Sequence, residues 1–370
     1  MTLKKLAALA FSTLFGLVLL EGLCTVWALQ SRGTMSVVEL NAKESGEVQI
    51  PASRIQPHPY FGFTFSDAVE DRNNIGTAGR DFPLRKDDSK FTILVVGGSV
   101  ANALSRTRIL ENELARYDFG KPVVVLSGAV PAWQQPQSLF MLANYGDVAD
   151  AVVSVEGFNE HIRLQGGAKR LEYPNAAFLE VNPVVSNGFD VCGRTWLSGV
   201  LRDFSSSHNS RALYFVTKAI RGRLDHKTES RIVKELYELP ADSQGKKSID
   251  FNLDQYAKYV RLMHATSKCL GLKDAYFVQP CPAIGKTLTP AEVASAGDLS
   301  YADTYTAMTN RLVGLNSEGV PVVSLADVFN GCDETIYADK IHCGQKTDGY
   351  RLMSARIADE LARLWQIQKK

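Results

Sequence analysis

The chain has 370 residues, of which 45% are hydrophobic and 22% are charged. This composition is ordinary for a folded globular protein and excludes a globally disordered chain. The 41 basic and 40 acidic side chains give a net charge of +1, whereas a nucleic-acid-binding protein normally carries a basic excess or a basic stripe. Nucleic acid is therefore not an expected partner.

The N-terminal segment is apolar and long enough to cross a bilayer as a helix. Lys4 and Lys5 precede an apolar run that continues to Leu29 and is interrupted by Glu21. A cleaved signal peptide is the alternative, but the end of the run lacks the small-residue pattern of a cleavage site. We therefore predict an uncleaved signal anchor over residues 1–30. The two lysines place its start in the cytoplasm and the rest of the chain on the periplasmic or extracytoplasmic side of a single-pass inner membrane protein.

The remainder is predicted to be a polar linker over 31–55 and a folded domain over 56–370. From Phe91 onward, short β-branched apolar runs alternate with segments of helical periodicity. The predicted strands are 91–96, 122–126, 151–155, 275–279 and 321–325. The predicted helices are 107–117, 135–145, 253–270, 301–315 and 344–368. This alternation predicts an α/β fold, a three-layer α/β/α sandwich around a five-stranded, mainly parallel sheet.

Residues 162–250 interrupt this alternation, because they are charged in places and only weakly patterned. Helices are predicted within this stretch over 211–223 and 229–239, the second of which is stopped by Pro240. We interpret the stretch as an insertion in the domain. It is either a lid or substrate-facing subdomain, or a solvated helical decoration.

Three short segments that follow the first three strands carry groups suited to acyl transfer. Ser99 follows Gly97-Gly98, and a serine hydroxyl becomes an effective nucleophile when a base takes its proton. Gly128 and Asn159 follow the next two strands and could donate N–H groups, together with the backbone N–H of Ser99, to a developing oxyanion. Each segment alone is more often an ordinary turn or helix cap. Because the carboxyl ends of parallel strands share one edge of a sheet, we expect the three segments to converge.

A fourth segment, Asp339 to His342, stands before the last predicted helix. Its spacing lets one tight turn bring the carboxylate against the imidazole. The carboxylate would orient the ring and stabilise its protonated form, and the ring would deprotonate Ser99. Since an isolated pair with this spacing is common, the indication comes from the four segments together.

The order of the four segments resembles the block order of the SGNH/GDSL hydrolase family, over roughly residues 90–160 and 250–367. The resemblance implies a flavodoxin-like sheet, ester hydrolysis through a serine and no cofactor. The implied catalytic triad consists of Ser99, Asp339 and His342. The implied oxyanion donors are Ser99, Gly128 and Asn159.

The sequence also departs from the family pattern. The nucleophile segment reads Gly-Gly-Ser-Val rather than a GDS-type string, and Glu160 stands where aspartate is usual. Glu21 late in the anchor, the aromatic segment 58–65 and the stretch 279–290 are similar to a membrane-anchored bacterial branch of the family. The insertion over 162–250 is atypically long, which leaves the substrate open.

Cysteine and histidine positions add two hypotheses and no metal site. The sequence contains no C-x-x-C or H-E-x-x-H pattern, so we expect no metal. Cys332 and Cys343 bracket the segment that carries Asp339 and His342. A disulfide between them would pin that loop in an oxidising compartment, and two unpaired thiols are the alternative. His161 is the other histidine of interest, either as a contact to substrate or as an ordinary core or surface residue.

The leading functional hypothesis is a serine esterase or deacylase that removes O-acetyl or other acyl groups from a cell-envelope glycan through an acyl-enzyme. An O-acyltransferase could use the same triad and pass the acyl group to a sugar hydroxyl. A non-catalytic envelope scaffold of the same fold is the third hypothesis, and the intact triad argues against it. The expected partners are an acylated carbohydrate or another small ester, and the membrane through the N-terminal helix.

Overall fold

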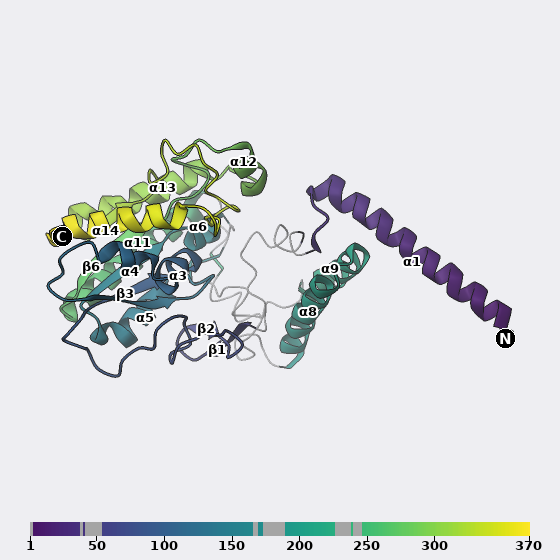
Figure 1. Cartoon of the computed structure of the whole chain (residues 1–370), viewed down its shortest axis with the longest axis horizontal. Helices are drawn as coiled ribbons and strands as arrows, with labels where there is room; N and C mark the ends of the chain where they lie inside the picture. Colours follow the sequence, from purple (N-terminus) through teal and green to yellow (C-terminus); the bar gives the residue numbers. More distant parts are fainter. Residues whose placement is uncertain are drawn as a thin grey trace. The chain divides into compact units, whose positions relative to one another are not determined.

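The computed structural model describes residues 3–37, 40, 54–165, 169–172, 189–225, 238–239 and 246–370. The chain forms two compact units (Figure 1). Unit 1 combines Met1–Pro57 with Ala176–Lys234, and unit 2 combines His58–Asn175 with Glu235–Lys370. Most of the predicted linker and the predicted helix over 229–239 lie outside the described residues.

Unit 2 contains a five-stranded sheet in which every neighbouring pair of strands is parallel. Its order is β4-β3-β5-β6-β7. The strands are β3 (Phe91–Gly97), β4 (Val123–Ala129), β5 (Ala151–Glu156), β6 (Lys273–Val278) and β7 (Val322–Ser324). All six residues of β5 are buried, as expected for a central parallel strand covered on both faces. The five strands match the five that the sequence predicts, so the expected α/β sheet is confirmed.

Helices cover both faces of this sheet and complete three layers (Figure 1). One layer consists of α3 (Ser99–Arg106), α4 (Ile109–Leu114) and α14 (Gly349–Trp365). The other consists of α5 (Gln137–Tyr145), α6 (Phe158–Gln165), α11 (Lys246–Cys269) and α13 (Ala302–Val313). The helix predicted over 107–117 is present in a shorter form as α4, which begins after Arg108 with its left-handed φ of 59°, and the preceding helix α3 was not predicted.

Several shorter elements accompany the sheet. They are β1 (Ile55–His58) and β2 (Gly62–Phe65), which pair with each other, the 3-10 helices η2 (Gly146–Val148) and η4 (Gly314–Glu318), which precede β5 and β7, and α12 (Pro290–Ala296), which follows β6. Phe61 and Phe63 of the aromatic segment are fully buried. These two side chains therefore belong to the core of unit 2.

Unit 1 contains three long helices among its described residues: α1 (Leu3–Arg32), α8 (Phe189–His208) and α9 (Arg211–Asp225). The part of α1 over Phe11–Ser31 is long and apolar enough to span a membrane. Helices α8 and α9 form a hairpin, and α9 packs on α1. The helix predicted over 211–223 is confirmed as α9, and this part of the insertion belongs to the same compact unit as the N-terminal helix.

Candidate active site

Ser99 lies at the carboxyl edge of the sheet, because β3, which is flanked by β4 and β5, ends two residues before it. It is the first residue of α3 and is partly exposed, whereas its neighbours Gly98 and Val100 are buried. A Cβ atom on Gly98 would lie 2.5 Å from Nδ2 of Asn159 and 3.1 Å from the carbonyl oxygen of Trp133. The glycine is thus required by the close approach of these groups to the serine turn.

His342 joins Ser99 to Asp339 in one hydrogen-bonded chain. Its Nε2 lies 2.7 Å from Oγ of Ser99, and its Nδ1 lies 2.8 Å from Oδ2 of Asp339. With Nδ1 protonated and bonded to the carboxylate, Nε2 is left as the base that faces the serine hydroxyl. The structure therefore brings together all three residues that the sequence singled out for the triad.

Asp339 is tied to its own loop as well as to the imidazole. Its Oδ1 accepts hydrogen bonds from the backbone N–H groups of Ile341 at 2.8 Å and His342 at 2.7 Å. Burial alone would raise the pKa of Asp339, but the hydrogen bonds and charge of His342 and the two backbone donors outweigh it and lower the pKa. The carboxylate is therefore ionised at neutral pH and suited to stabilising an imidazolium.

The loop that carries these residues is closed by its own backbone. The N–H of Ala338 donates to the carbonyl of His342 at 2.8 Å, and the N–H of Gly344 donates to that of Ile336 at 2.8 Å. Both bonds join the strand-like stretch before Asp339 to the stretch after it. The aspartate and the histidine therefore sit at the tip of a closed turn.

Glu292 holds the start of that loop from α12. Its Oε1 accepts from the backbone N–H groups of Ile336 at 2.8 Å and Tyr337 at 3.0 Å. Its Oε2 accepts from Nζ of Lys286 and from the N–H of Thr289, both at 2.8 Å. The side chains of Glu292 and Lys286 are 0% and 1% exposed, so this is a buried ion pair. It accounts for part of the stretch 279–290 that the sequence left without a role.

Asn159 lies in the first turn of α6, where its Nδ2 donates to the carbonyl oxygen of Trp133 at 2.7 Å. An amide nitrogen carries two hydrogens, so one remains for a ligand. Glu160 fixes the turn, since its buried carboxylate accepts from the N–H groups of Gly157 and Gln135 at 2.9 Å each. Burial, followed by the nearby charge of Glu156, raises the pKa of Glu160.

Gly128 has a different position from the one expected. It lies within β4, paired in register with Val96, rather than in the loop after the strand. A Cβ atom on it would lie 2.8 Å from Leu94 Cδ1 and from Met141 Cγ, so its Cα packs against core side chains. The loop that follows β4 approaches the serine turn through the carbonyl of Trp133. An oxyanion role for Gly128 stays a prediction.

His161 is buried in the core rather than exposed to a substrate. It is 1% exposed, and its Nε2 lies 2.8 Å from Oγ1 of Thr304. Its ring packs against Tyr301 and Tyr305 at centroid distances of 5.3 and 5.1 Å. Burial lowers the pKa of His161 to about 4. This burial contradicts the expected substrate contact, because helical periodicity turns His161 inward from the same helix that presents Asn159.

The hypothesis of a Cys332–Cys343 disulfide is also wrong, because both cysteines are free thiols. Cys343 is buried beneath α14, where a Cβ on Gly349 would lie 2.5 Å from its sulfur, whereas Cys332 is partly exposed. Burial raises the pKa of Cys343 to about 12. The loop is held by Glu292 and its own backbone bonds instead.

Among the described residues, no group of three or more His, Cys, Asp or Glu side chains could hold a metal ion.

Several residues that support the site were not predicted from the sequence. Trp133 positions Asn159 through its carbonyl, and its own ring nitrogen donates to the carbonyl of Phe63 at 3.0 Å. The aromatic segment thus supports the loop after β4. Glu292 carried one sequence signal, since Thr289-Pro290 and Glu292 form a capping box at the start of α12. That signal predicts a helix start but not the contact with the catalytic loop.

Comparison of the sequence with protein-family models and with curated proteins gives no match. Among solved structures, a GDSL-like lipase from Bacteroides thetaiotaomicron is 11% identical, with a TM-score of 0.36 over 74% of this chain and 88% of its own. A lipase/acylhydrolase from Enterococcus faecalis is 14% identical, with a TM-score of 0.34 over 76% of this chain and 98% of its own. An acetyl xylan esterase is 10% identical, with a TM-score of 0.37 over 74% and 98%.

Proposed function

We propose that the protein is a membrane-anchored serine esterase that removes acyl groups from a cell-envelope glycan. The observation that carries the proposal is the chain of hydrogen bonds from Ser99 through His342 to Asp339, with distances of 2.7 and 2.8 Å. All three side chains are partly exposed, so a substrate can reach the nucleophile.

The chemistry begins with attack of Ser99 Oγ on the carbonyl carbon of the ester. His342 Nε2 takes the hydroxyl proton and then gives it to the leaving alcohol, which leaves an acyl-enzyme. Asp339 holds the ring by its Nδ1–H and stabilises the imidazolium without taking the proton. Water deprotonated by the same nitrogen then attacks the acyl-enzyme and releases the carboxylic acid.

Two donors support stabilisation of the oxyanion. The backbone N–H of Ser99 belongs to the first turn of α3, where N–H groups have no partner within the helix and the helix dipole favours negative charge. The second hydrogen on Asn159 Nδ2 is the other donor. Donors fixed in this way need no reorganisation during the reaction, which is why they lower the barrier.

The substrate class is inferred from location. The apolar helix over Phe11–Ser31, with two lysines before it, supports a cytoplasmic N-terminus and an extracytoplasmic catalytic unit. A hydrolase tethered there meets O-acylated envelope glycans. An acyl-enzyme could also pass its acyl group to a sugar hydroxyl, and the test below separates the two outcomes.

The test compares the full chain with its Ser99→Ala variant in detergent micelles, first on a chromogenic acetyl ester and then on O-acetylated envelope polysaccharide. Ser317→Ala is the matched control, because Ser317 is an exposed serine in η4. We expect release of acetate by the parent and the control and none by Ser99→Ala. Full activity in Ser99→Ala would remove the assigned nucleophile. Turnover only with an added sugar acceptor would assign a transferase instead.

A further inference from the structure

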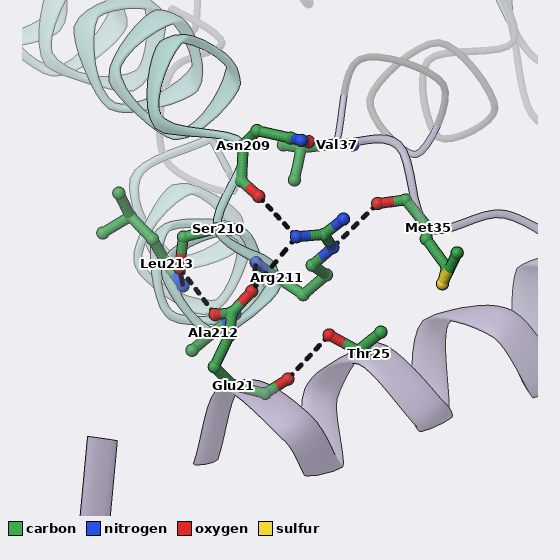
Figure 2. Close-up of polar contacts among 9 residues, drawn as sticks. All are labelled: Glu21, Thr25, Met35, Val37, Asn209, Ser210, Arg211, Ala212 and Leu213. Carbon is green, nitrogen blue, oxygen red and sulfur yellow. Dashed lines mark hydrogen bonds and ion pairs between the residues drawn. The ribbon is translucent and has the colours of Figure 1, made fainter. Parts of the chain in front are cut away.

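Glu21 of α1 caps the N-terminus of α9 (Figure 2). Its Oε1 accepts from the backbone N–H of Arg211 at 2.8 Å, and its Oε2 accepts from the N–H of Ala212 at 2.9 Å and from the hydroxyl of Ser210 at 2.7 Å. The hydroxyl of Ser210 in turn accepts from the N–H of Leu213 at 3.2 Å. The first three N–H groups of α9, which have no partner within the helix, are therefore all satisfied by protein atoms.

The Arg211 side chain completes the cap. Its Nε donates to the carbonyl of Met35 at 2.8 Å, and its Nη1 donates to the carbonyl of Asn209 at 2.8 Å and lies 3.5 Å from Glu21 Oε1 (Figure 2). The N–H of Val37 donates to Asn209 Oδ1 at 3.3 Å. The turn between α8 and α9 is thus bonded on both sides to the N-terminal segment.

The position of Glu21 along α1 sets the depth of this turn. Glu21 lies eight residues before Leu29, the end of the apolar run that begins after Lys5. At 1.5 Å per residue this is about 12 Å from the extracytoplasmic end of the run, inside the ~30 Å hydrocarbon core of a bilayer. A segment at that depth must have its backbone polar groups satisfied internally. The complete capping of α9 meets that requirement.

The charge pattern of the hairpin fits the same depth. From Phe204 to Thr217 the sequence contains one Lys, Arg, Asp or Glu residue, Arg211, which Glu21 pairs. Charged residues flank this stretch, and they are Arg202, Asp203, Lys218, Arg221 and Arg223. After the stretch, Lys218 is partly exposed and Arg223 is exposed, whereas Arg221 is buried. Lys218 and Arg223 lie about 10 and 18 Å along α9 from its first residue. Long cationic side chains at that distance can reach lipid headgroups while their stems stay in apolar surroundings.

Apolar side chains remain uncovered on the surface of unit 1. On α8, Trp196, Val200 and Phe204 recur every four residues and are 65%, 40% and 47% exposed. On α9, Val216 and Ile220 are 51% and 41% exposed. Four-residue spacing places each set on one face of its helix. Exposed apolar patches of this kind mark protein or membrane contact sites.

We propose that α8 and α9 form a re-entrant hairpin that enters the extracytoplasmic leaflet beside α1, with lipid acyl chains covering its apolar faces and Glu21 locking its tip. The inference rests on the proposed membrane anchoring. Continuity with the spanning helix selects lipid as the occupant. Ala28 of α1 and Tyr214 of α9 are 0% and 1% exposed in one cluster, so α1 shares a buried core with the hairpin.

The test places photoreactive benzoylphenylalanine at single positions of the full chain, reconstituted in vesicles of phosphatidylethanolamine and phosphatidylglycerol with tritiated acyl chains. Phe15 of α1 reports on the anchor, and Phe204 reports on the hairpin. Tyr60, an aromatic residue of unit 2 that is 66% exposed, is the matched negative control. We expect lipid adducts at Phe15 and Phe204 and none at Tyr60.

The other outcomes test the hairpin and the membrane anchor separately. Adducts at Phe15 without adducts at Phe204 would overturn the hairpin inference and keep the anchor. Absence of adducts at Phe15 would overturn the proposed membrane anchoring itself. A protein adduct of doubled mass at Phe204 would replace lipid with a second copy of the chain as the occupant.

Variants of Glu21 test whether its hydrogen bonds to the start of α9 keep the hairpin in the membrane. Glu21→Leu removes both acceptors from the N–H groups of Arg211 and Ala212, and we expect about tenfold fewer lipid adducts at Phe204 with no change at Phe15. Glu21→Gln keeps one acceptor oxygen and should fall between Glu21→Leu and the parent. Thr25→Val is the matched control, since the Thr25 hydroxyl bonds only within α1, to the carbonyl of residue 21. An unchanged yield of lipid adducts at Phe204 in Glu21→Leu would show that Glu21 does not hold the tip of the hairpin.

Discussion

Replacement of Glu292 by glutamine tests how the catalytic loop is held. The carboxylate accepts four hydrogen bonds, two from the backbone of Ile336 and Tyr337 and two from Lys286 and Thr289. Glutamine has one acceptor oxygen and one donor nitrogen. Whichever way its amide turns, Glu292→Gln points two hydrogens at two donors and leaves the buried ammonium of Lys286 without a counter-charge.

The magnitude follows from the pKa and from burial. Burial alone would raise the pKa of Glu292, but Lys286 and three backbone N–H groups lower it from 4.5 to about 2. At 1.36 kcal/mol per pKa unit, this difference is worth about 3 kcal/mol of folding free energy. Removal of one partner from a buried ion pair costs about 3–5 kcal/mol. We therefore expect Glu292→Gln to lower the free energy of unfolding by about 3–5 kcal/mol at pH 7.

The pH dependence has a definite sign. Because the folded-state pKa of Glu292 is depressed, its contribution is fully present above 4.5 and is lost as the pH falls toward about 2. The stability gap between the parent and Glu292→Gln should therefore narrow by about 2 kcal/mol between pH 7 and pH 3. Urea unfolding in detergent micelles, followed by tryptophan fluorescence, measures this gap.

Glu318→Gln is the matched control for Glu292→Gln. Glu318 and Arg261 form an ion pair with side chains 45% and 40% exposed, and exposed pairs contribute little. We expect its unfolding curve to match that of the parent. Esterase activity should fall in Glu292→Gln at concentrations of denaturant where it is still folded, because the loop with Asp339 and His342 loses its anchor. A variant Glu292→Gln that is as stable as the parent at pH 7, or whose gap stays constant with pH, would refute the reasoning.

Three further predictions concern the nucleophile turn and the cysteines. Asn159→Ala should lower kcat by about 10²–10³ with little change in KM, and an unchanged kcat would remove the amide from the site. Gly98→Ala should also lower kcat, because the new Cβ would lie 2.5 Å from Asn159 Nδ2, while circular dichroism stays like that of the parent; normal turnover would contradict the close approach. Alkylation of the unreduced, denatured chain followed by intact-mass analysis should modify both Cys332 and Cys343, and a mass without those two adducts would show a bridge.

The sequence predicted the sheet and the triad because their signals are local. Four of the five strands of the sheet contain short β-branched runs, β6 is mainly aromatic and apolar, and Ser99 follows the run of β3 after two glycines. Parallel strands then bring their carboxyl ends to one edge without further information. The three-residue spacing of Asp339 and His342 also fixes their contact within one turn. Both features depend on neighbours in sequence and on a regular topology.

The positions of Gly128 and His161 depend on features that local sequence patterns do not reveal. The run of apolar residues ending at Leu126 continues as strand to Ala129, so Gly128 falls inside the ladder rather than after it, and composition gives no sign of the extension. His161 is only two residues from Asn159, but on a helix of 3.6 residues per turn it points to another face. The side it faces is decided by Tyr301 and Tyr305 of a distant segment.

Three glutamates hold functional segments by accepting hydrogen bonds from backbone N–H groups elsewhere in the chain. Glu21 caps α9, Glu160 fixes the Asn159 turn, and Glu292 holds the catalytic loop. Each is an acidic side chain within an apolar helix or a buried layer, and in Glu160 that burial raises the pKa. Every non-proline residue has the same backbone N–H donor, so the sequence of the bonded segment does not identify it as the partner of such a glutamate. A glutamate in an apolar part of the sequence therefore indicates that its side chain bonds the backbone of another segment. Only the fold identifies that segment.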